Sequence, residues 1–286
     1  MNTTPGRIES AGRDANRTRG AAPWLIVAAL ALAAGAAGAL LNLTGSRPAT
    51  APIRLDDVTT HGEWVWIARA DGDSLRAYVA YPERRDTAPA VIVIHEIYGL
   101  TDWEPTVADR FAAAGYVAVV PDLLSSKHGR TPADADSARA LIGDLERERV
   151  MTDLDAAFTW LDEQPAVADG RIGSIGFCWG GGTSFAYAAH NPRLAAAVVA
   201  YGPAPDSAQL ASIAAPVLGV YGENDARINA DLDRVARQMQ AAGKSFEHDV
   251  YPETGHGFLK PGRRGSDGPQ PARAWERILA FYSKHL

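Results

Sequence analysis

The chain has 286 residues, of which 47% are hydrophobic and 22% charged, with 27 glycines and 18 prolines. This composition is typical of a globular protein and excludes a disordered, collagen-like or coiled-coil chain. The net charge is −6, and because the first 50 residues contribute +3, the other 236 carry −9. An acidic body repels phosphate backbones, so no nucleic-acid partner is predicted.

The N-terminal region has the pattern of a membrane segment. Residues 21–41 carry no charge and follow a basic leader, residues 1–20, with four arginines. As a helix this segment would span roughly 31 Å, close to the thickness of a bilayer core, and the arginines predict a cytoplasmic N-terminus. A signal peptide cleaved near residues 49–51, or a misread start, is the alternative. An anchored, secreted or periplasmic protein would have its body outside the cytoplasm, and residues 42–60 would form a tether.

Residues 61–286 are expected to form one domain of alternating strands and helices. Residues 64–67 and 76–81 predict an opening antiparallel pair. The following strands are expected at residues 90–94, 116–120, 171–177, 194–201, 215–221 and 246–251. Helices are expected at residues 107–114, 182–189, 230–242 and 272–285, with one long helix or two shorter ones over residues 133–163. This alternation predicts an α/β fold with a mostly parallel sheet covered by helices on both faces.

The segment Gly176-Phe177-Cys178-Trp179-Gly180 follows a predicted buried strand and precedes a predicted helix. It has the G-x-S-x-G pattern of a nucleophile elbow, with cysteine in place of serine. A sharp turn holds the central residue in a strained conformation, and the flanking glycines let the chain pass close to itself. The positive end of the following helix would favour a thiolate and a developing oxyanion. The alternative is that Cys178, the only cysteine in the chain, is simply a buried apolar group.

Two further residues complete a pattern of nucleophilic catalysis. Asp225 and His256 each follow a predicted strand, so they would lie at the same edge of a parallel sheet as Cys178. The imidazole would accept the thiol proton and return it to the leaving group, and the carboxylate would fix the tautomer of the ring. Asp122, which follows another predicted strand, is the rival acid. The other histidines lack such a context.

The loop after the strand at residues 90–94 reads His95-Glu96-Ile97-Tyr98-Gly99. The backbone N–H groups of Ile97 and Trp179 are the candidates for an oxyanion hole, because that loop and the residue after the nucleophile supply it in this architecture. Glu96 could accept the thiol proton or restrain the thiol until substrate arrives.

These motifs together resemble the dienelactone hydrolase family, the Cys-His-Asp branch of the α/β hydrolases. The matching stretches are His95 to Leu100, Ala108 to Tyr116, Val120 to Leu123, Gly176 to Gly181, the strand end at Asp225, and Gly255 to Phe258. The resemblance covers roughly residues 60 to 286 and implies an α/β-hydrolase fold. The N-terminal membrane-type segment departs from the usual soluble member.

The resemblance also implies roles for single residues. Cys178 would be the nucleophile, His256 the base, Asp225 its orienting acid and Glu96 the carboxylate that governs the thiol. Tyr98 and Lys260 would contact substrate. Family members carry arginines that bind a substrate carboxylate, whereas this chain has Ser126 near one such place and Lys260 at the other, and lysine lacks the bidentate fork.

The expected activity is hydrolysis of small carboxylic esters or lactones, of the carboxymethylenebutenolidase type, through an acyl-thioester. No cofactor is expected, and no metal site is expected because histidine and cysteine lack ligand spacing. Two other functions fit the sequence less well. One is a membrane-tethered binding domain that keeps the fold without catalysis, and the other is a redox thiol, for which the chain has no resolving cysteine.

Overall fold

The computed structural model describes residues 61–286. The predictions for residues 1–20, 21–41 and 42–60 lie outside the described residues. Within residues 61–286, no helix combines the length and the apolar character needed to cross a bilayer.

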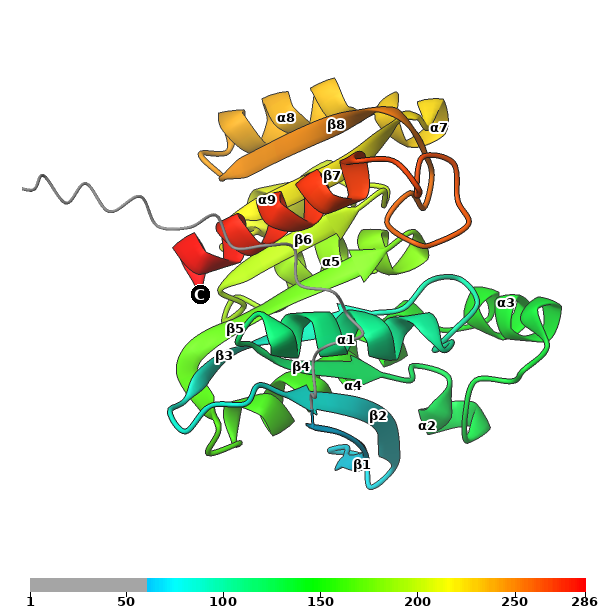
Figure 1. Ribbon diagram of the computed structural model, residues 1–286, viewed down its shortest axis with the longest axis vertical. Coiled ribbons are helices and arrows are strands. Elements are labelled where there is room, and N and C mark those ends of the chain that lie inside the picture. The colour runs from blue at the N-terminus through cyan, green and yellow to red at the C-terminus, as the bar shows by residue number, and fades with distance from the viewer. Residues whose placement is uncertain (1–60) are drawn as a thin grey trace, which may run out of the picture. The chain divides into compact units, whose positions relative to one another are not determined.

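One eight-stranded sheet runs through the described part of the chain, in the order β1-β2-β4-β3-β5-β6-β7-β8 (Figure 1). β1 pairs antiparallel with β2, and β2 pairs antiparallel with β4. Every other neighbouring pair is parallel. The strands are β1 His61–Ala68, β2 Ser74–Tyr81, β3 Ala88–Ile94, β4 Val117–Pro121, β5 Val167–Phe177, β6 Ala196–Ala200, β7 Val217–Asn224 and β8 Phe246–Gly255.

Helices connect the parallel strands, a final helix follows the last strand, and together they cover both faces of the sheet. They are α1 Trp103–Ala113, α2 Ser125–His128, α3 Ala135–Gly143, α4 Arg147–Asp162, α5 Trp179–His190, α6 Ser207–Ser212, α7 Ala226–Asn229, α8 Leu232–Ala241 and α9 Gln270–His285. Burial on both faces explains why β3, β4 and β6 are continuous apolar runs instead of alternating ones.

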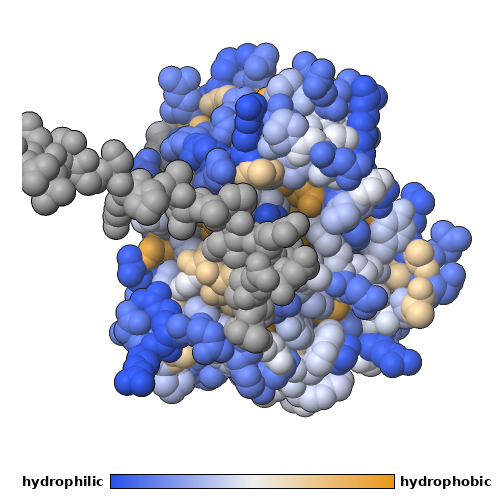
Figure 2. Space-filling model, in the orientation of Figure 1, coloured by the Kyte–Doolittle hydropathy of each residue, from blue (hydrophilic) through white to orange (hydrophobic). Residues whose placement is uncertain are grey.

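Two hydrophobic layers enclose the sheet. On one face, α1 and α9 pack against the strands through residues such as Phe111 and Tyr282. On the other face, α4, α5 and α8 pack through residues such as Leu154, Phe185 and Val235. The outer surface seen in Figure 2 consists mainly of hydrophilic and intermediate side chains, as expected where helices turn their polar sides to solvent.

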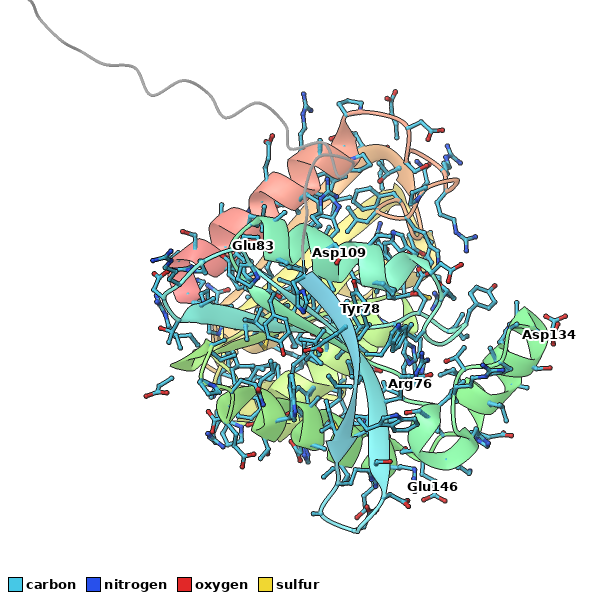
Figure 3. All side chains as sticks on the ribbon, turned by 60° about the horizontal axis from the view of Figure 1, so that its bottom comes forward. Arg76, Tyr78, Glu83, Asp109, Asp134 and Glu146 are labelled. Carbon is cyan, nitrogen blue, oxygen red and sulfur yellow. The ribbon has the colours of Figure 1, made fainter. Side chains whose placement is uncertain are left out.

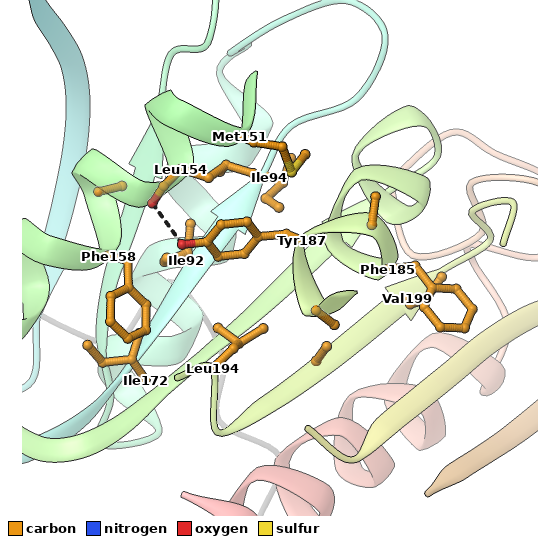
Figure 4. Packing of buried hydrophobic residues seen from close by; sticks show 14 of the residues in the cluster. Ile92, Ile94, Met151, Leu154, Phe158, Ile172, Phe185, Tyr187, Leu194 and Val199 are labelled. Carbon is orange, nitrogen blue, oxygen red and sulfur yellow. Dashed lines mark hydrogen bonds between the residues drawn. The ribbon is translucent and has the colours of Figure 1, made fainter. Parts of the chain in front are cut away.

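Polar contacts fix helices to these layers. On α1, Asp109 accepts a hydrogen bond of 3.0 Å from the Tyr78 hydroxyl on β2 (Figure 3). The hydroxyl of the buried Tyr187 on α5 donates to the Leu154 carbonyl of α4 at 3.2 Å (Figure 4). The second contact links α4, which precedes β5, to α5, which follows it.

Most of the predicted elements are confirmed, and the differences have local causes. The segment predicted as one long helix or two is two helices, α3 and α4, separated by a break after Gly143. Helix α1 begins at Trp103, before Pro105, because proline is tolerated in the first turn. Helix α5 begins at Trp179, three residues before the predicted start at Gly182. The short helices α2, α6 and α7 were not predicted, since four to six residues carry little periodicity.

Candidate active site

A strained turn presents Cys178 between β5 and α5. Its backbone has φ 58° and ψ −114°, a left-handed conformation that costs a residue with a side chain on the order of 1–3 kcal/mol. A Cβ on Gly176 would lie 1.8 Å from the Gly180 carbonyl oxygen, and one on Gly180 would lie 2.3 Å from the His95 carbonyl oxygen. Only glycine therefore fits at these two positions, and the thiol is left half-buried at the carboxyl edge of the sheet.

The register of β7 and β8 brings Asp225 and His256 together. Asn224 and Gly255 are paired across the two parallel strands, so the next residue of each strand emerges at the same point. The His256 Nδ1 and Asp225 Oδ2 atoms are 2.5 Å apart, and Asp225 is 7% exposed. We assign the proton to Nδ1 because the carboxylate can only accept, which leaves Nε2 for the other side of the ring.

Cys178 and His256 line one cavity of about 210 Å³, together with Glu96, Ile97 and Tyr98. A hydrogen bond with the Cys178 side chain is the largest of the effects that raise the pKa of His256, and the bond with Asp225 raises it further. Partial burial opposes both, and the pKa of His256 is raised from 6.5 to about 9. The imidazolium is therefore the favoured form at neutral pH.

The raised pKa of His256 predicts the direction of a pH profile. A group whose pKa is raised keeps its proton until the pH passes that value, so the imidazolium should be lost as the pH rises through about 9. If it is the acid that protonates the leaving group, kcat/KM for ester hydrolysis should fall above about pH 9. Initial rates at substrate concentrations well below KM, corrected for hydroxide-catalysed hydrolysis, measure this limb. A profile that instead rises through about pH 6.5 and stays level to pH 10 would show that neutral His256 is the working form.

His95 supports both candidate oxyanion donors. Its ring is fully buried, with Nδ1 2.9 Å from the Glu96 carbonyl oxygen, and its Nε2 accepts a bond of 3.3 Å from Leu123 N. The same ring stacks on Trp179 with centroids 5.6 Å apart. The His95 side chain thus restrains both the loop that carries the Ile97 N–H and Trp179, the first residue of α5. The first N–H groups of a helix have no acceptor within it.

Glu96 and Lys260 contact each other. Glu96 is 4% exposed, and its Oε2 accepts a bond of 2.8 Å from Lys260 Nζ, which also lies 4.9 Å from the centroid of the Trp103 ring. The sequence assigned Lys260 to the substrate and Glu96 to the thiol. In the structure Glu96 lines the cavity and Lys260 does not. The two side chains form an ion pair, so the Lys260 ammonium is already neutralised by a carboxylate.

Arg263 is a cavity residue that the sequence did not indicate. It lines the same 210 Å³ cavity as Cys178 and His256, from the segment between β8 and α9. No sequence motif marks Arg263, because the segment between β8 and α9 has no regular periodicity. Tyr98, predicted to contact substrate, lines this cavity and also a neighbouring one of about 500 Å³.

Tyr201 is a second residue that the sequence did not indicate. It follows β6 with φ 41°, it is fully buried, and its ring centroid is 5.1 Å from that of His256 in an edge-on arrangement. Burial and the nearby acidic groups raise its pKa well above 10, so the phenol stays neutral. Among the described residues its hydroxyl has no hydrogen-bond partner. A bulky residue rarely adopts this backbone region, so the backbone of Tyr201 is strained.

Asp122, the rival acid, has another use. Its carboxylate accepts bonds from the Thr131 N–H at 2.8 Å, from the Thr131 hydroxyl at 2.7 Å and from the Leu124 N–H at 3.2 Å. It therefore holds the loop between β4 and α3, while Asp225 holds His256. Within residues 61–286, no three His, Cys, Asp or Glu side chains gather as ligands of a metal ion would.

Comparisons with known proteins relate the chain to one family. The sequence model of the dienelactone hydrolase family matches residues 75–286. A Salmonella typhimurium protein named "Putative carboxymethylenebutenolidase" is 34% identical over 231 residues, which are 76% of this chain and 85% of that protein. A Bradyrhizobium protein named "Probable 2-oxo-3-(5-oxofuran-2-ylidene)propanoate lactonase" is 31% identical over 78% of this chain and 94% of its own length.

A solved structure gives the same result for the fold. The crystal structure titled as a putative dienelactone hydrolase from Klebsiella pneumoniae superposes with a TM-score of 0.71 at 29% identity, covering 79% of this chain and 99% of that one. The family model, the relatives and this structure agree: the chain belongs to the dienelactone hydrolase family.

Proposed function

We propose that the protein hydrolyses carboxylic esters or lactones by covalent catalysis on Cys178. The names of its relatives support a lactone or ester as substrate. The observation that carries the proposal is the shared cavity of Cys178 and His256, in which the imidazole is bonded on its far side to the buried Asp225.

In the first half of the reaction, the Cys178 thiolate attacks the carbonyl carbon and forms a C–S bond. The Ile97 and Trp179 N–H groups stabilise the oxyanion. The C–O bond to the alcohol then breaks, and the His256 imidazolium gives its proton to the departing oxygen. In a lactone, this alcohol stays attached to the acyl group.

In the second half, neutral His256 takes a proton from a water molecule that attacks the thioester. The C–S bond breaks, the acid is released, and the thiolate–imidazolium pair is restored. Asp225 holds the ring in one tautomer throughout. A cysteine at the end of a strained turn needs no metal or cofactor for these steps.

The covalent intermediate is the feature that separates this proposal from a non-catalytic binding domain. Mixing the protein with p-nitrophenyl acetate and quenching in acid within milliseconds to seconds should give a mass increase of one acetyl group on the peptide that contains Cys178. The burst of p-nitrophenol should equal the enzyme concentration if deacylation is slow. Turnover without any acyl adduct on that peptide, together with no burst, would reject the covalent route. No turnover of any ester or lactone would favour the binding domain.

A further inference from the structure

A second cavity lies beside the site, and the proposed reaction makes no use of it. It measures about 310 Å³ and is bordered mainly by apolar side chains from the start of α4, from α5 and from the segment after β6. For scale, an apolar cavity of about 150 Å³ is enough to bind benzene. A hollow of this size and lining is the usual form of a small-molecule subsite.

The topology places this cavity at the same edge of the sheet as the thiol. Helix α5 starts immediately after Cys178, and its first residue, Trp179, lines the cavity. The Cα atoms of Cys178 and Trp179 are ~3.8 Å apart because they are consecutive. Pro203 and Pro205, which also line the cavity, follow the carboxyl end of β6, the strand next to β5. The two cavities have no lining residue in common, and Trp179, which directly follows Cys178 in the chain, is the residue that links the 310 Å³ cavity to the elbow.

The walls of the cavity are held firmly. Trp179 stacks on the fully buried His95, and a Cβ on Gly182 would lie 2.9 Å from Pro203, so the segment after β6 packs directly on the first turn of α5. Val150 and Met151 of α4 are 3% and 6% exposed and close another side. A cavity bounded by packed elements keeps its shape without a ligand, which lowers the cost of binding one.

The side chains on either side of the elbow pack against different core layers. His256 packs edge-on against Tyr201, which belongs to the layer formed with α1 and α9. The alcohol must leave towards His256, because that ring protonates it. Trp179 packs against the opposite layer, formed with α4 and α5. Cys178 packs against the first layer, so an acyl group bonded to its sulfur would enter the cavity by extending past Trp179.

We propose that this apolar cavity is the acyl-binding subsite and that the protein prefers esters or lactones whose acyl part carries an apolar group of several carbons. The inference rests on the proposed ester hydrolysis. Each methylene moved from water into the cavity should raise kcat/KM by up to about fourfold, the value for complete burial.

The test fills the cavity from a wall that does not touch the reacting atoms. Ala186 lines it from the second turn of α5 and is 8% exposed, so Ala186→Leu should occupy the space. For the unmodified protein, kcat/KM should rise along p-nitrophenyl acetate, butyrate and hexanoate. In Ala186→Leu, acetate should be hydrolysed within about threefold of the unmodified rate, and the preference for hexanoate should disappear.

Ala189→Leu, the same change one turn later on the same helix and outside the cavity, is the matched control and should keep the rising series. Thermal unfolding of both variants shows whether they are folded. A flat acyl series in the unmodified protein, or a series unchanged by Ala186→Leu, would overturn the subsite.

A second measurement does not depend on ester turnover. Alkyl methanethiosulfonates convert a thiol into a mixed disulfide and release methanesulfinate, and Cys178 is the only cysteine in the chain. For each reagent, the rate with Cys178 is divided by its rate with glutathione. This ratio should be larger for the butyl reagent than for the methyl reagent, and Ala186→Leu should remove this advantage. If the advantage is present in a protein that hydrolyses no ester, the cavity stands and the proposed function fails. Equal relative rates for both reagents would argue against the cavity itself.

Discussion

Cys178→Ala should lower kcat for ester hydrolysis by on the order of 10⁴-fold or more, because no other described nucleophile stands at the end of the strained turn. Alanine removes one sulfur atom and leaves the cavity, the His256–Asp225 pair and both oxyanion donors in place. Substrate binding should therefore persist while turnover is lost. The measurement is kcat and KM on one ester, together with product inhibition as an index of binding.

The fold of this variant should be unchanged, since the side chain is half-buried and small. A thermal midpoint close to that of the unmodified protein would show that lost activity is a chemical effect. Cys178→Ser adds a second comparison, because the hydroxyl retains the hydrogen bond to His256 but ionises far less readily than a thiol. We expect activity between those of Cys178→Ala and the unmodified protein. Retention of more than a tenth of kcat in Cys178→Ala would disprove the assignment of the nucleophile.

Asp225→Asn should lower kcat by about 10²–10⁴-fold, because the imidazole would be misoriented or would carry its proton on the wrong nitrogen. The amide can donate to Nδ1 and so favour the tautomer whose proton faces Cys178. It also removes one of the two bonds that raise the pKa of His256, so the falling limb of the pH profile should move below about pH 9. The lost rate and the displaced limb are separate readouts, and a purely structural effect would not produce the second.

Asp122→Asn is the matched control for this experiment. It makes the same chemical change in a buried carboxylate at the end of another strand of the sheet, β4. Because Asp122 bonds to Leu124 and Thr131, its loss should lower the free energy of unfolding by about 1–3 kcal/mol and leave kcat nearly unchanged at temperatures where the protein is folded. If Asp122→Asn abolished turnover and Asp225→Asn did not, the roles of the two acids would have to be exchanged.

The positions of the two acids illustrate how far strand patterns reach. Apolar runs followed by polar residues located Cys178, Asp225 and His256 at strand ends, and parallel strands bring their carboxyl ends to one edge. The chain order then sufficed to group them. The same reasoning does not exclude Asp122 as the acid that orients His256, because Asp122 also follows a strand. Only the contacts of its carboxylate with Thr131 assign it to the loop.

Patterns of local sequence were less informative for loops and helix starts. The glycine-rich run after Cys178 delayed the predicted start of α5 by three residues, since glycine is a poor helix former. In the fold these glycines permit close packing against β3 and the segment after β6, and that packing outweighs the propensity. The pairing of Glu96 with Lys260, 164 residues apart, could not be anticipated either.

The sequence by itself determined the α/β class, the strand order along the chain, the elbow and the identity of the residues that follow the strands. These follow from local rules, because apolar periodicity and glycine spacing act over a few residues. The tertiary structure decided which charges neutralise one another, that Arg263 and Tyr201 border the reacting groups, and that an apolar cavity adjoins Trp179. Such features depend on how loops distant in the chain pack at one sheet edge, and that packing is set by shape and burial over the whole domain.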